Sequence, residues 1–322
     1  MGIISDCGTD SLKDAASSLL NGNLVAFPTE TVYGLGADAT NKDAVARIYS
    51  VKGRPVGHPL IVHISSLERL DIWASNIPEY AIKLAINFWP GPMTLILPRA
   101  GLAKDFVTGG QDNIGIRVPS HKVAQALIKE FEDQGGFGVA APSANRFGKV
   151  SPTTANAVVT ELGKFLNSND HIIDGGPCEI GIESTIIDCT RDLPEILRPG
   201  GITFKMIEEL LLMKIKTIDI VTNNIKSPGL MNAHYAPNAK VYRAGTPKIG
   251  DGFIALSSVS TPDGAIRLAN PKNNDEFAQV FYSALRLADH KLLKNVYVVE
   301  PIGEDIAIAI NDRIFKAINA NN

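Results

Sequence analysis

Basic side chains stand beside turns, or inside apolar strands, at four points in the first 200 residues: Lys52, Arg54, Arg117 and Arg198. Lys52 and Arg54 are separated by a single glycine and precede Pro55. Because proline fixes the backbone of this turn, the turn could hold both cations toward the phosphates of a ligand. The alternative is a pair of cations at the end of a helix, where the helix dipole favours positive charge.

Arg117 is the charged residue of an apolar strand predicted over residues 114–118. Alternation along the strand places its side chain on the face opposite to Ile116 and Val118. If both faces of the sheet are covered, the guanidinium needs a carboxylate or a phosphate as its partner, because an unpaired buried charge is strongly destabilising. If the strand lies at an edge, the guanidinium can remain in water.

Small polar side chains follow two predicted strands where each strand ends. The strand predicted over residues 24–27 leads into a loop predicted over residues 29–40, which begins with the sequence TETVYGLG. The strand predicted over residues 138–141 leads into PSAN at residues 142–145. Ligands of α/β sheets bind at such strand ends, although turn chemistry alone could account for either loop. Together with the four cations, these donors suit a polyanionic small molecule better than a long duplex.

Familiar nucleotide-binding and catalytic motifs are missing. The sequence has no G-x-x-x-x-G-K-[ST] loop and no G-x-S-x-G turn. Residues 34–39 match G-x-G-x-x-A, but they lie seven residues past the end of the strand and open no helix. His58 and His63 are five residues apart, a poor spacing for one helix face, and the three cysteines include no C-x-x-C pair. We therefore expect unreactive thiols and no protein-held metal site.

Strand and helix patterns alternate over residues 10–213, and several strands are joined by short links. Short links favour antiparallel neighbours, so we expect a twisted mixed sheet with helices. Residues 214–237 resemble a linker in composition. Beyond them, residues 253–318 follow strand–helix–strand–helix order without a phosphate-binding glycine pattern. The sequence thus predicts an α/β protein with a first domain at 1–213 and a smaller, Rossmann-like α/β domain at 238–322.

Composition limits the classes of partner. The 322 residues include 31 Lys and Arg against 34 Asp and Glu, a net charge of −3, which argues against a large uniformly basic surface for nucleic acid. The longest stretches without a charged residue are 15 residues long, shorter than the roughly 18–20 that a membrane span needs. No basic segment precedes an apolar one at the N-terminus, so we expect no signal peptide and a cytoplasmic protein.

Six segments, in this order, resemble the YrdC-domain family of threonylcarbamoyl-AMP synthases. They are FPTETVYGLG at 27–36, KGRP at 52–55 with PLIVH at 59–63, IRVPSH at 116–121, APSAN at 141–145, IESTII at 182–187 and LRPGG at 197–201. The sequences SPG at 227–229 and HYAP at 234–237 resemble the linker of the family's long, two-domain form. A single segment is a modest signal, but six in series are highly specific. The resemblance covers nearly the whole chain, most loosely over the last 80 residues.

The resemblance implies synthesis of L-threonylcarbamoyladenylate from L-threonine, bicarbonate and ATP, with release of pyrophosphate and with Mg²⁺ accompanying ATP. The product would pass to a downstream transferase that forms threonylcarbamoyladenosine next to the anticodon of tRNA. Contact with tRNA itself is expected to be weak, and no membrane is implied. Such a reaction needs positioning and cancellation of negative charge, because a carbamate anion attacks the α-phosphate, and it needs no side-chain nucleophile.

The resemblance also implies roles for individual residues. The expected threonine contacts are Thr31, His63, Arg117, Ala141 and Ser184. The expected ATP contacts are Lys52, Arg54, His58, Asn113, Ser143, Asn145, Ser151, Arg198, His234 and Tyr235. Lys52, Arg54 and Arg117 are the expected catalytic residues. His58 stands where many relatives carry asparagine.

Other functions remain open at this point. A non-catalytic module could hold RNA or a nucleotide in the same cleft, and a two-domain α/β protein could have an unrelated activity. The negative net charge counts against a dedicated RNA binder. The linker carries stiff prolines with apolar and aromatic residues, so we expect a lid over the cleft. The alternative is a linker packed between the domains without a role in the site.

Overall fold

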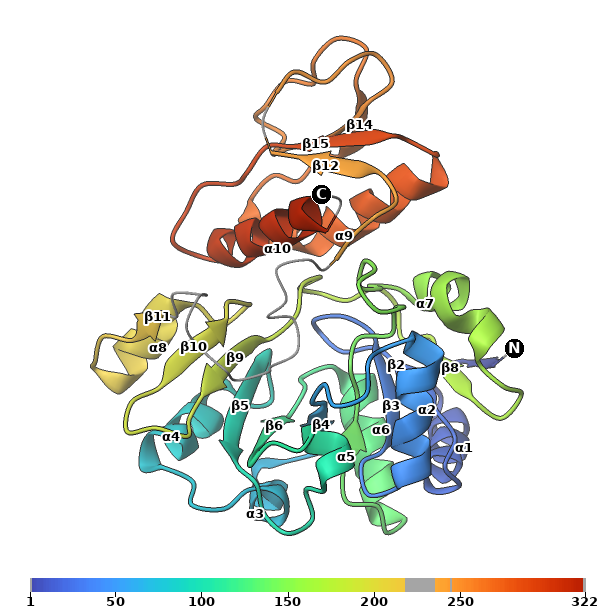
Figure 1. Cartoon of the computed structure of the whole chain (residues 1–322), viewed down its shortest axis with the longest axis vertical. Helices are drawn as coiled ribbons and strands as arrows, with labels where there is room; N and C mark the ends of the chain where they lie inside the picture. Colours follow the sequence, from blue (N-terminus) through green and yellow to red (C-terminus); the bar gives the residue numbers. More distant parts are fainter. Residues whose placement is uncertain (1, 218–234, 244, 321–322) are drawn as a thin grey trace.

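Two β-sheets of unequal size organise the chain, and each carries its own helices (Figure 1). The computed structural model describes residues 2–217, 235–243 and 245–320. Over these residues the larger sheet has eleven strands in the order β1-β8-β2-β3-β7-β4-β6-β5-β9-β10-β11, and the smaller has four in the order β12-β15-β13-β14. The predicted fold class, a mixed sheet with helices plus a smaller α/β domain, is confirmed.

The elements of the larger sheet have the following bounds. The strands are β1 (Ile3–Ser5), β2 (Val25–Phe27), β3 (Gly34–Asp38), β4 (Ile61–His63), β5 (Met93–Pro98), β6 (Asn113–Arg117), β7 (Val139–Ala140), β8 (His171–Ile173), β9 (Thr185–Asp188), β10 (Glu195–Arg198) and β11 (Lys216–Thr217). The helices are α1 (Thr9–Leu20), α2 (Lys42–Lys52), α3 (Leu70–Trp73), α4 (Glu79–Phe88), α5 (Asp105–Thr108), α6 (Lys122–Asp133), α7 (Ala155–Leu162) and α8 (Phe204–Leu211), with short 3-10 helices at Leu67–Arg69 and Gly163–Phe165. Among the described helices, none combines the length and apolar content that crossing a bilayer requires.

The larger sheet is mixed, as the short connections predict. β3 runs antiparallel to both β2 and β7, and β5 runs antiparallel to β6. By contrast, β4 is parallel to β6, and β5 is parallel to β9. Antiparallel neighbours need only a few connecting residues, and residues 28–33 alone join β2 to β3. These short connections bring the motif-bearing loops to one region of the sheet.

The strand β3 corrects the loop predicted over residues 29–40. Its sequence, GLGAD, lacks the β-branched and aromatic residues that favour strands. Close packing explains the glycine at its centre: a Cβ on Gly36 would lie 2.8 Å from atoms of both Phe27 and Val139. Because packing requires glycine at this position, the sequence of β3 has a low strand propensity, and the strand was not predicted.

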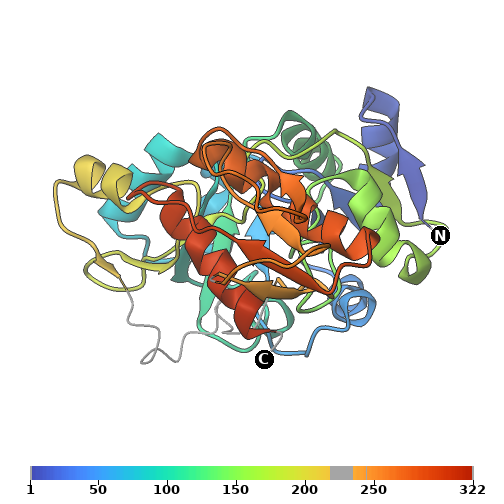
Figure 2. The same ribbon diagram turned by 90° about the horizontal axis from the view of Figure 1, so that it is seen from above.

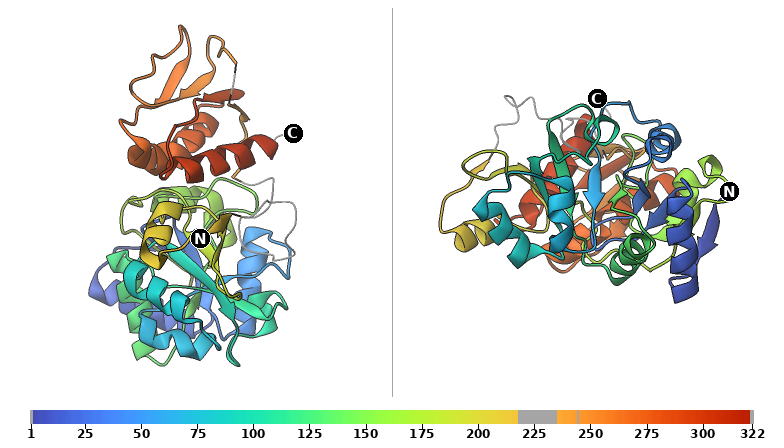
Figure 3. Two further views of the ribbon diagram at one scale, coloured as in Figure 1. Left: turned by 90° about the vertical axis from the view of Figure 1, so that its left-hand side faces the viewer. Right: turned by 90° about the horizontal axis from the view of Figure 1, so that it is seen from below.

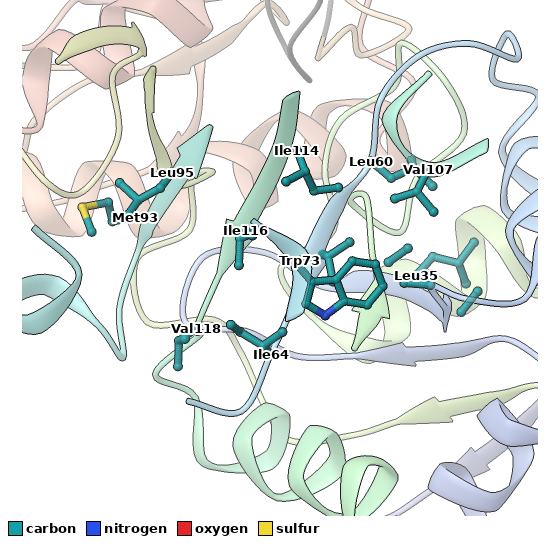
Figure 4. Packing of buried hydrophobic residues seen from close by; sticks show 14 of the residues in the cluster. Leu35, Leu60, Ile64, Trp73, Met93, Leu95, Val107, Ile114, Ile116 and Val118 are labelled. Atoms are coloured by element: carbon teal, nitrogen blue, oxygen red, sulfur yellow. The ribbon is translucent and has the colours of Figure 1, made fainter. Parts of the chain in front are cut away.

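Helices cover the two faces of the larger sheet unequally. The largest apolar cluster joins one face to helices that include α2, α3, α4, α7 and α8. Figure 4 shows part of this packing, with Ile116 of β6 between Leu95 of β5 and Trp73 of α3. On the other face, α1 and α6 cover β2, β7 and β8. Among the described residues, the rest of that face carries one small apolar cluster: Ile61, Ile96, Ile186 and Leu197.

The second domain is a parallel four-stranded sheet with two helices. Its elements are β12 (Lys240–Tyr242), β13 (Gly252–Ile254), β14 (Ile266–Ala269), α9 (Asn274–His290), β15 (Asn295–Val298) and α10 (Ala307–Asn319). The helices α9 and α10 lie between this sheet and the first domain (Figures 1 and 3). In Figure 2, which is seen from above, both helices lie over the first domain. The predicted strand–helix–strand–helix order misses β12 and β14. Both are short edge strands, and each contains a basic residue.

The two domains meet through a shared apolar cluster. Val32 and Ile182 of the first domain pack in one cluster with Tyr235, Phe277 and Tyr282. The first sheet extends to Thr217, beyond the boundary expected at residue 213. The expected lid falls largely on residues 218–234, which lie outside the described residues. Tyr235, the next described residue, belongs to the cluster that both domains share.

We expect Gly36→Ala to lower the free energy of unfolding by about 1–3 kcal/mol, the usual effect of overpacking a filled interior. The new Cβ would press on Phe27 and Val139, which flank β3 on neighbouring strands. Denaturant unfolding followed by circular dichroism measures the change. Gly101→Ala is the control, because a Cβ there meets no atom within 4 Å. Equal stability of the two variants would contradict this account of β3.

Candidate active site

A cavity lies over the part of the larger sheet that the helices leave uncovered. All five expected threonine contacts line it: Thr31, His63, Arg117, Ala141 and Ser184. Four of the expected ATP contacts line it as well: Arg54, Ser143, Arg198 and Tyr235. The remaining lining residues are Thr29, Val32, Gly34, Ile61, Pro142 and Glu183. The structure thus gathers residues from all six motif segments, and one from the linker, around one space.

The pairing of β4 with β6 sets His63 and Arg117 side by side, because the two residues are register partners in neighbouring parallel strands. Val62 and Ile116 belong to the helix-covered core. Since side chains alternate along a strand, His63 and Arg117 point to the opposite face, toward the cavity. An imidazole and a guanidinium therefore form one wall of the site.

Arg117 is buried and is held by three acceptors. Its Nη2 donates to Glu30 Oε1 at 2.7 Å, its Nη1 to Thr31 Oγ1 at 3.0 Å, and its Nε to the carbonyl of Gly91 at 3.3 Å. The expectation that a buried guanidinium in this strand needs a carboxylate or a phosphate is therefore confirmed, with the carboxylate of Glu30 as the partner. The partner belongs to the protein itself, which fixes the guanidinium before any ligand arrives.

Glu30 is a residue that the motif reasoning missed, although it stands inside FPTETVYGLG. Its second carboxylate oxygen, Oε2, accepts a hydrogen bond from the amide of Ser120 at 3.1 Å. Glu30 is as deeply buried as the arginine with which it pairs. A lone acidic residue in an otherwise neutral, buried loop is a usable signal for such a pair, because buried carboxylates are almost always paired.

His63 is a neutral imidazole in this site. Burial, followed by the positive charge of Arg117, lowers the pKa of His63 to about 3. Its Nδ1 is buried and has no hydrogen-bond partner among the described residues. The site therefore offers one unpaired polar atom beside Arg117, without adding a second positive charge there.

Ser184 and Arg198 also line the cavity, and they are bonded to each other. The Nε and Nη2 atoms of Arg198 donate to the carbonyl of Ser184 at 3.0 and 2.9 Å, and Nη2 also lies 3.1 Å from Ser184 Oγ. The Ser184 hydroxyl is 2.8 Å from that of Thr94 on β5. Arg198 is thus bound to the segment that carries a predicted threonine contact.

Arg54 brings a third guanidinium to the cavity. Its Nη2 donates to the carbonyl of Pro59 at 3.2 Å, and its Cζ lies 5.9 Å from the centre of the Phe147 ring. Its Nε is buried without a hydrogen-bond partner among the described residues. A buried cationic donor without an acceptor is costly unless a ligand supplies one. Arg54 is therefore arranged to receive an anion.

Lys52 does not line the cavity with Arg54, although both were expected to face phosphates. Its Nζ donates to the carbonyls of Ser143 and Asn145, each at 2.5 Å. Burial, followed by the charge of Arg54, holds the pKa of Lys52 well below its usual value. In this structure Lys52 fixes the PSAN loop, and its contact with ATP stays a prediction.

Four other expected ATP contacts are not among the lining residues: His58, Asn113, Asn145 and Ser151. Asn145 donates to the carbonyls of Arg146 and Lys149, and Ser151 donates to Glu183 at 2.6 Å. The ring of His58 meets that of Phe147 edge-on, with centroids 5.7 Å apart. The ATP contacts of these residues stay predictions, and His234 lies outside the described residues.

Glu183 is a cavity-lining carboxylate that the sequence reasoning also missed. It accepts hydrogen bonds from Ser151, from Tyr282 at 2.8 Å and from Arg313 at 3.0 Å. Burial alone would raise the pKa of Glu183, but Arg313 and Arg198, with the two hydroxyls, hold it at about 2. Tyr282 and Arg313 belong to the second domain, where no motif pointed to the site.

Family comparisons cover nearly the whole chain. Residues 17–200 match the family described as "Telomere recombination", and residues 202–318 match the family described as "Threonylcarbamoyl-AMP synthase, C-terminal domain". The two matches meet close to the end of the motif LRPGG. Both halves of the chain are therefore covered, including the second domain, whose sequence carries the weakest motifs.

Individual relatives agree with these matches. The threonylcarbamoyl-AMP synthase of Bacillus subtilis is 46% identical over 326 residues, which cover 95% of this chain and 92% of that protein. That of Pyrococcus abyssi is 45% identical over 237 residues, which cover 71% of this chain and 66% of that protein. The crystal structure of P. abyssi Sua5 complexed with L-threonine superposes with a TM-score of 0.88 at 36% identity, over 99% of this chain and 97% of that chain. The present chain therefore belongs to the threonylcarbamoyl-AMP synthase family, in its two-domain form, and is an enzyme of the nucleotidyl-transferring class.

Proposed function

We propose that this cavity synthesises L-threonylcarbamoyladenylate from L-threonine, bicarbonate and ATP, and releases pyrophosphate. The observation that carries the proposal is the charge of the cavity lining: three arginines, Arg54, Arg117 and Arg198, against one carboxylate, Glu183. When their ion-pair partners are counted as well, Glu30 for Arg117 and Arg313 for Glu183, four arginines stand against two carboxylates. The lining therefore holds a surplus of positive charge in a mostly buried space, which suits substrates that are all anionic or zwitterionic.

Threonine fits the side of the cavity formed by Arg117, His63 and Ser184. The guanidinium of Arg117 is oriented by Glu30 and Thr31, so it can receive a carboxylate without having to be reorganised. Neutral His63, with its unpaired Nδ1, can hydrogen-bond the hydroxyl or the amine of the substrate. The solved Pyrococcus relative, which holds L-threonine, supports a threonine site in this fold.

The nucleotide fits the side of the cavity formed by Arg54, Ser143 and Arg198. The unpaired Nε of Arg54 is a donor suited to a phosphate oxygen. Lys52 supports this side indirectly, because it holds the backbone of the loop that carries Ser143. Fixed loops and fixed cations together provide the positioning that transfer to a phosphate requires.

The chemistry then needs little beyond this arrangement. The amine of threonine and bicarbonate give a carbamate with loss of water, and a carbamate oxygen attacks the α-phosphate of ATP. The new P–O bond forms as the bond to the pyrophosphate leaving group breaks. Both reacting partners are anions, so guanidinium groups that cancel charge and align them lower the barrier. The proposal assigns no covalent intermediate to any side chain of the enzyme.

Magnesium is proposed to enter as part of the ATP substrate. The cavity lining does not fit a protein-held Mg²⁺ site, because both carboxylate oxygens of Glu183 already accept hydrogen bonds, from Ser151, Tyr282 and Arg313. Mg²⁺ commonly keeps most of its ligands as waters and substrate phosphates. The adenylate would then serve a transferase acting on tRNA, and the use of ATP and tRNA favours the cytoplasm.

The full-length chain should release pyrophosphate from ATP only when threonine and bicarbonate are both present. A coupled pyrophosphate assay measures the rate, and mass spectrometry detects the adenylate. Omission of either co-substrate is the control. Pyrophosphate release that is the same without threonine, or binding of ATP without any turnover, would contradict the proposal and favour a nucleotide-binding module.

Arg117→Lys should raise the KM for threonine by about 10- to 150-fold, as expected for loss of a charge-assisted contact of about 1.5–3 kcal/mol. Lysine keeps a positive charge opposite Glu30, but it cannot present two donors in a fixed fork. Steady-state pyrophosphate release, with each substrate varied in turn, should show little change in the KM for ATP.

The matched control for Arg117 is Arg69→Lys, since Arg69 also pairs with a buried carboxylate, that of Glu132, outside the cavity lining. This variant should retain the KM values of the unmodified enzyme. An unchanged threonine KM in Arg117→Lys would remove Arg117 from the threonine site.

Arg54→Gln should weaken the binding of a non-hydrolysable ATP analogue by about tenfold or more, because the buried cationic donor is lost. Titration calorimetry measures the affinity, and threonine affinity should be retained. Arg47→Gln is the control, because Arg47 lies on α2, the helix that precedes Arg54 in the sequence, but pairs with Asp170 outside the cavity. If Arg54→Gln binds the analogue as tightly as Arg47→Gln does, Arg54 does not contact the nucleotide. Its role would then be that of a cation next to the C-terminal end of α2, where the helix dipole favours positive charge.

A further inference from the structure

Arg313 is a fully buried arginine of α10 in the second domain, and its guanidinium reaches two segments that line the active-site cavity. We infer that Arg313 is a positioning residue for the reaction: it fixes Ser184 and Arg198 in the geometry that the substrates require. The inference rests on the proposed function, and it assigns the second domain a direct part in that function.

The guanidinium of Arg313 bonds to both segments at once. Its Nε donates to Glu183 Oε2 at 3.0 Å, and its Nη2 donates to the carbonyl of Glu183 at 3.3 Å. Its Nη1 donates to the carbonyl of Pro199 at 2.8 Å. One planar group thus joins the residue before Ser184 to the residue after Arg198.

The same two segments are also bonded to each other within the cavity. Arg198 donates twice to the carbonyl of Ser184, at 3.0 and 2.9 Å. The side chain of Arg198 therefore binds the segment that carries Ser184. The backbone next to Arg198, at the carbonyl of Pro199, binds Arg313. The pairing of β9 with β10 and the two hydrogen bonds between Thr185 and Ile202 hold the strands themselves together. Loss of the Arg313 bonds would therefore leave the strands paired, but it would remove the contacts at Glu183 and Pro199, the residues next to Ser184 and Arg198.

Charge gives Arg313 a second effect on Arg198. Glu183 stays ionised, because burial, which raises its pKa, is outweighed by Arg313 and Arg198 and by two hydroxyls. Arg313 supplies a direct ion pair to this carboxylate at 3.0 Å. Without it, Glu183 would draw on the other nearby guanidinium, that of Arg198, and reduce the positive charge available to the nucleotide.

Lysine cannot replace Arg313 in this arrangement. The three bonds to Glu183 and Pro199 leave the guanidinium from three different nitrogens, in the plane of the group. An ammonium is a point charge at the end of a flexible stem, so it can satisfy the carboxylate but cannot span both segments. Arg313→Lys therefore retains the buried charge and removes the bridge.

Arg286 provides a matched comparison, because it joins the same two domains without touching the cavity. On α9, its Nη1 contacts Glu161 of α7 at 3.2 Å, and its Nη2 donates to the carbonyl of Val150. Neither Glu161 nor Val150 lines the cavity. If general docking of the domains governs the site, the two arginines should be equivalent. If Arg313 has a positioning role, they should differ.

The test uses the full-length chain with Arg313→Lys and Arg286→Lys, and calorimetry with L-threonine and a non-hydrolysable ATP analogue. Arg313→Lys should weaken both ligands by about tenfold and lower kcat, while Arg286→Lys retains both affinities. Circular dichroism and thermal unfolding establish that each variant is folded. Tyr282→Phe, which removes only the hydroxyl that donates to Glu183, should give a smaller loss in the same direction.

A double-mutant cycle distinguishes positioning from a loss of overall stability. In the Arg198→Gln background, adding Arg313→Lys should change affinity for the ATP analogue by less than about twofold, because the residue that it positions is gone. Fully additive losses, or an Arg313→Lys protein that binds both ligands as tightly as the unmodified chain, would overturn the inference. An unmodified chain that binds neither ligand would overturn the proposed function, and the positioning role with it.

Discussion

Burial of guanidinium groups is the constraint on which the rest of the structure depends. A site for anionic substrates needs cations that are shielded from water, yet a buried cation is destabilising until an acceptor fixes it. In this protein, carboxylates and backbone carbonyls of the chain itself accept hydrogen bonds from the buried arginines. Arg117 pairs with Glu30, and Arg313 pairs with Glu183, while Arg198 is held by a backbone carbonyl. Each arginine is thereby oriented before substrates bind, and the cavity lining still keeps more cations than carboxylates.

The mixed sheet supplies the frame for these pairs. Parallel pairing of β4 with β6 sets His63 beside Arg117, and the antiparallel pair β2 and β3 is joined by residues 28–33 alone. Glu30 lies in the short connection between β2 and β3, so it reaches Arg117 across the sheet from a loop that has little freedom. An all-parallel sheet would need a long crossover at this point and could not place that loop so tightly.

Features that depend on neighbouring residues in the sequence could be predicted from the sequence pattern. The apolar strand around Arg117 predicted a partner for its charge if both faces of the sheet are covered, and the five residues expected to contact threonine do line one cavity. Partner identity could not be predicted in this way, because Glu30 and Glu183 meet their arginines over 87 and 130 residues of separation. The strand β3 was missed for a different reason: Gly36 is required by contact with Phe27 and Val139, not by strand propensity. The edge strands β12 and β14 are too short for an alternating pattern to stand out.

The contacts between the domains indicate that the site and the second domain form one cooperative unit. Val32 belongs to the loop that carries Thr31, and it packs in the same cluster as Tyr235 and Tyr282. The carboxylate of Glu183 has one hydroxyl partner from the first domain, Ser151, and two partners from the second. Separating the domains would therefore expose apolar surface next to Thr31, and would remove two of the partners of the buried Glu183 carboxylate. Val32 and Glu183 both line the cavity. The contacts that stabilise the packing of the two domains therefore also stabilise the arrangement of the cavity lining.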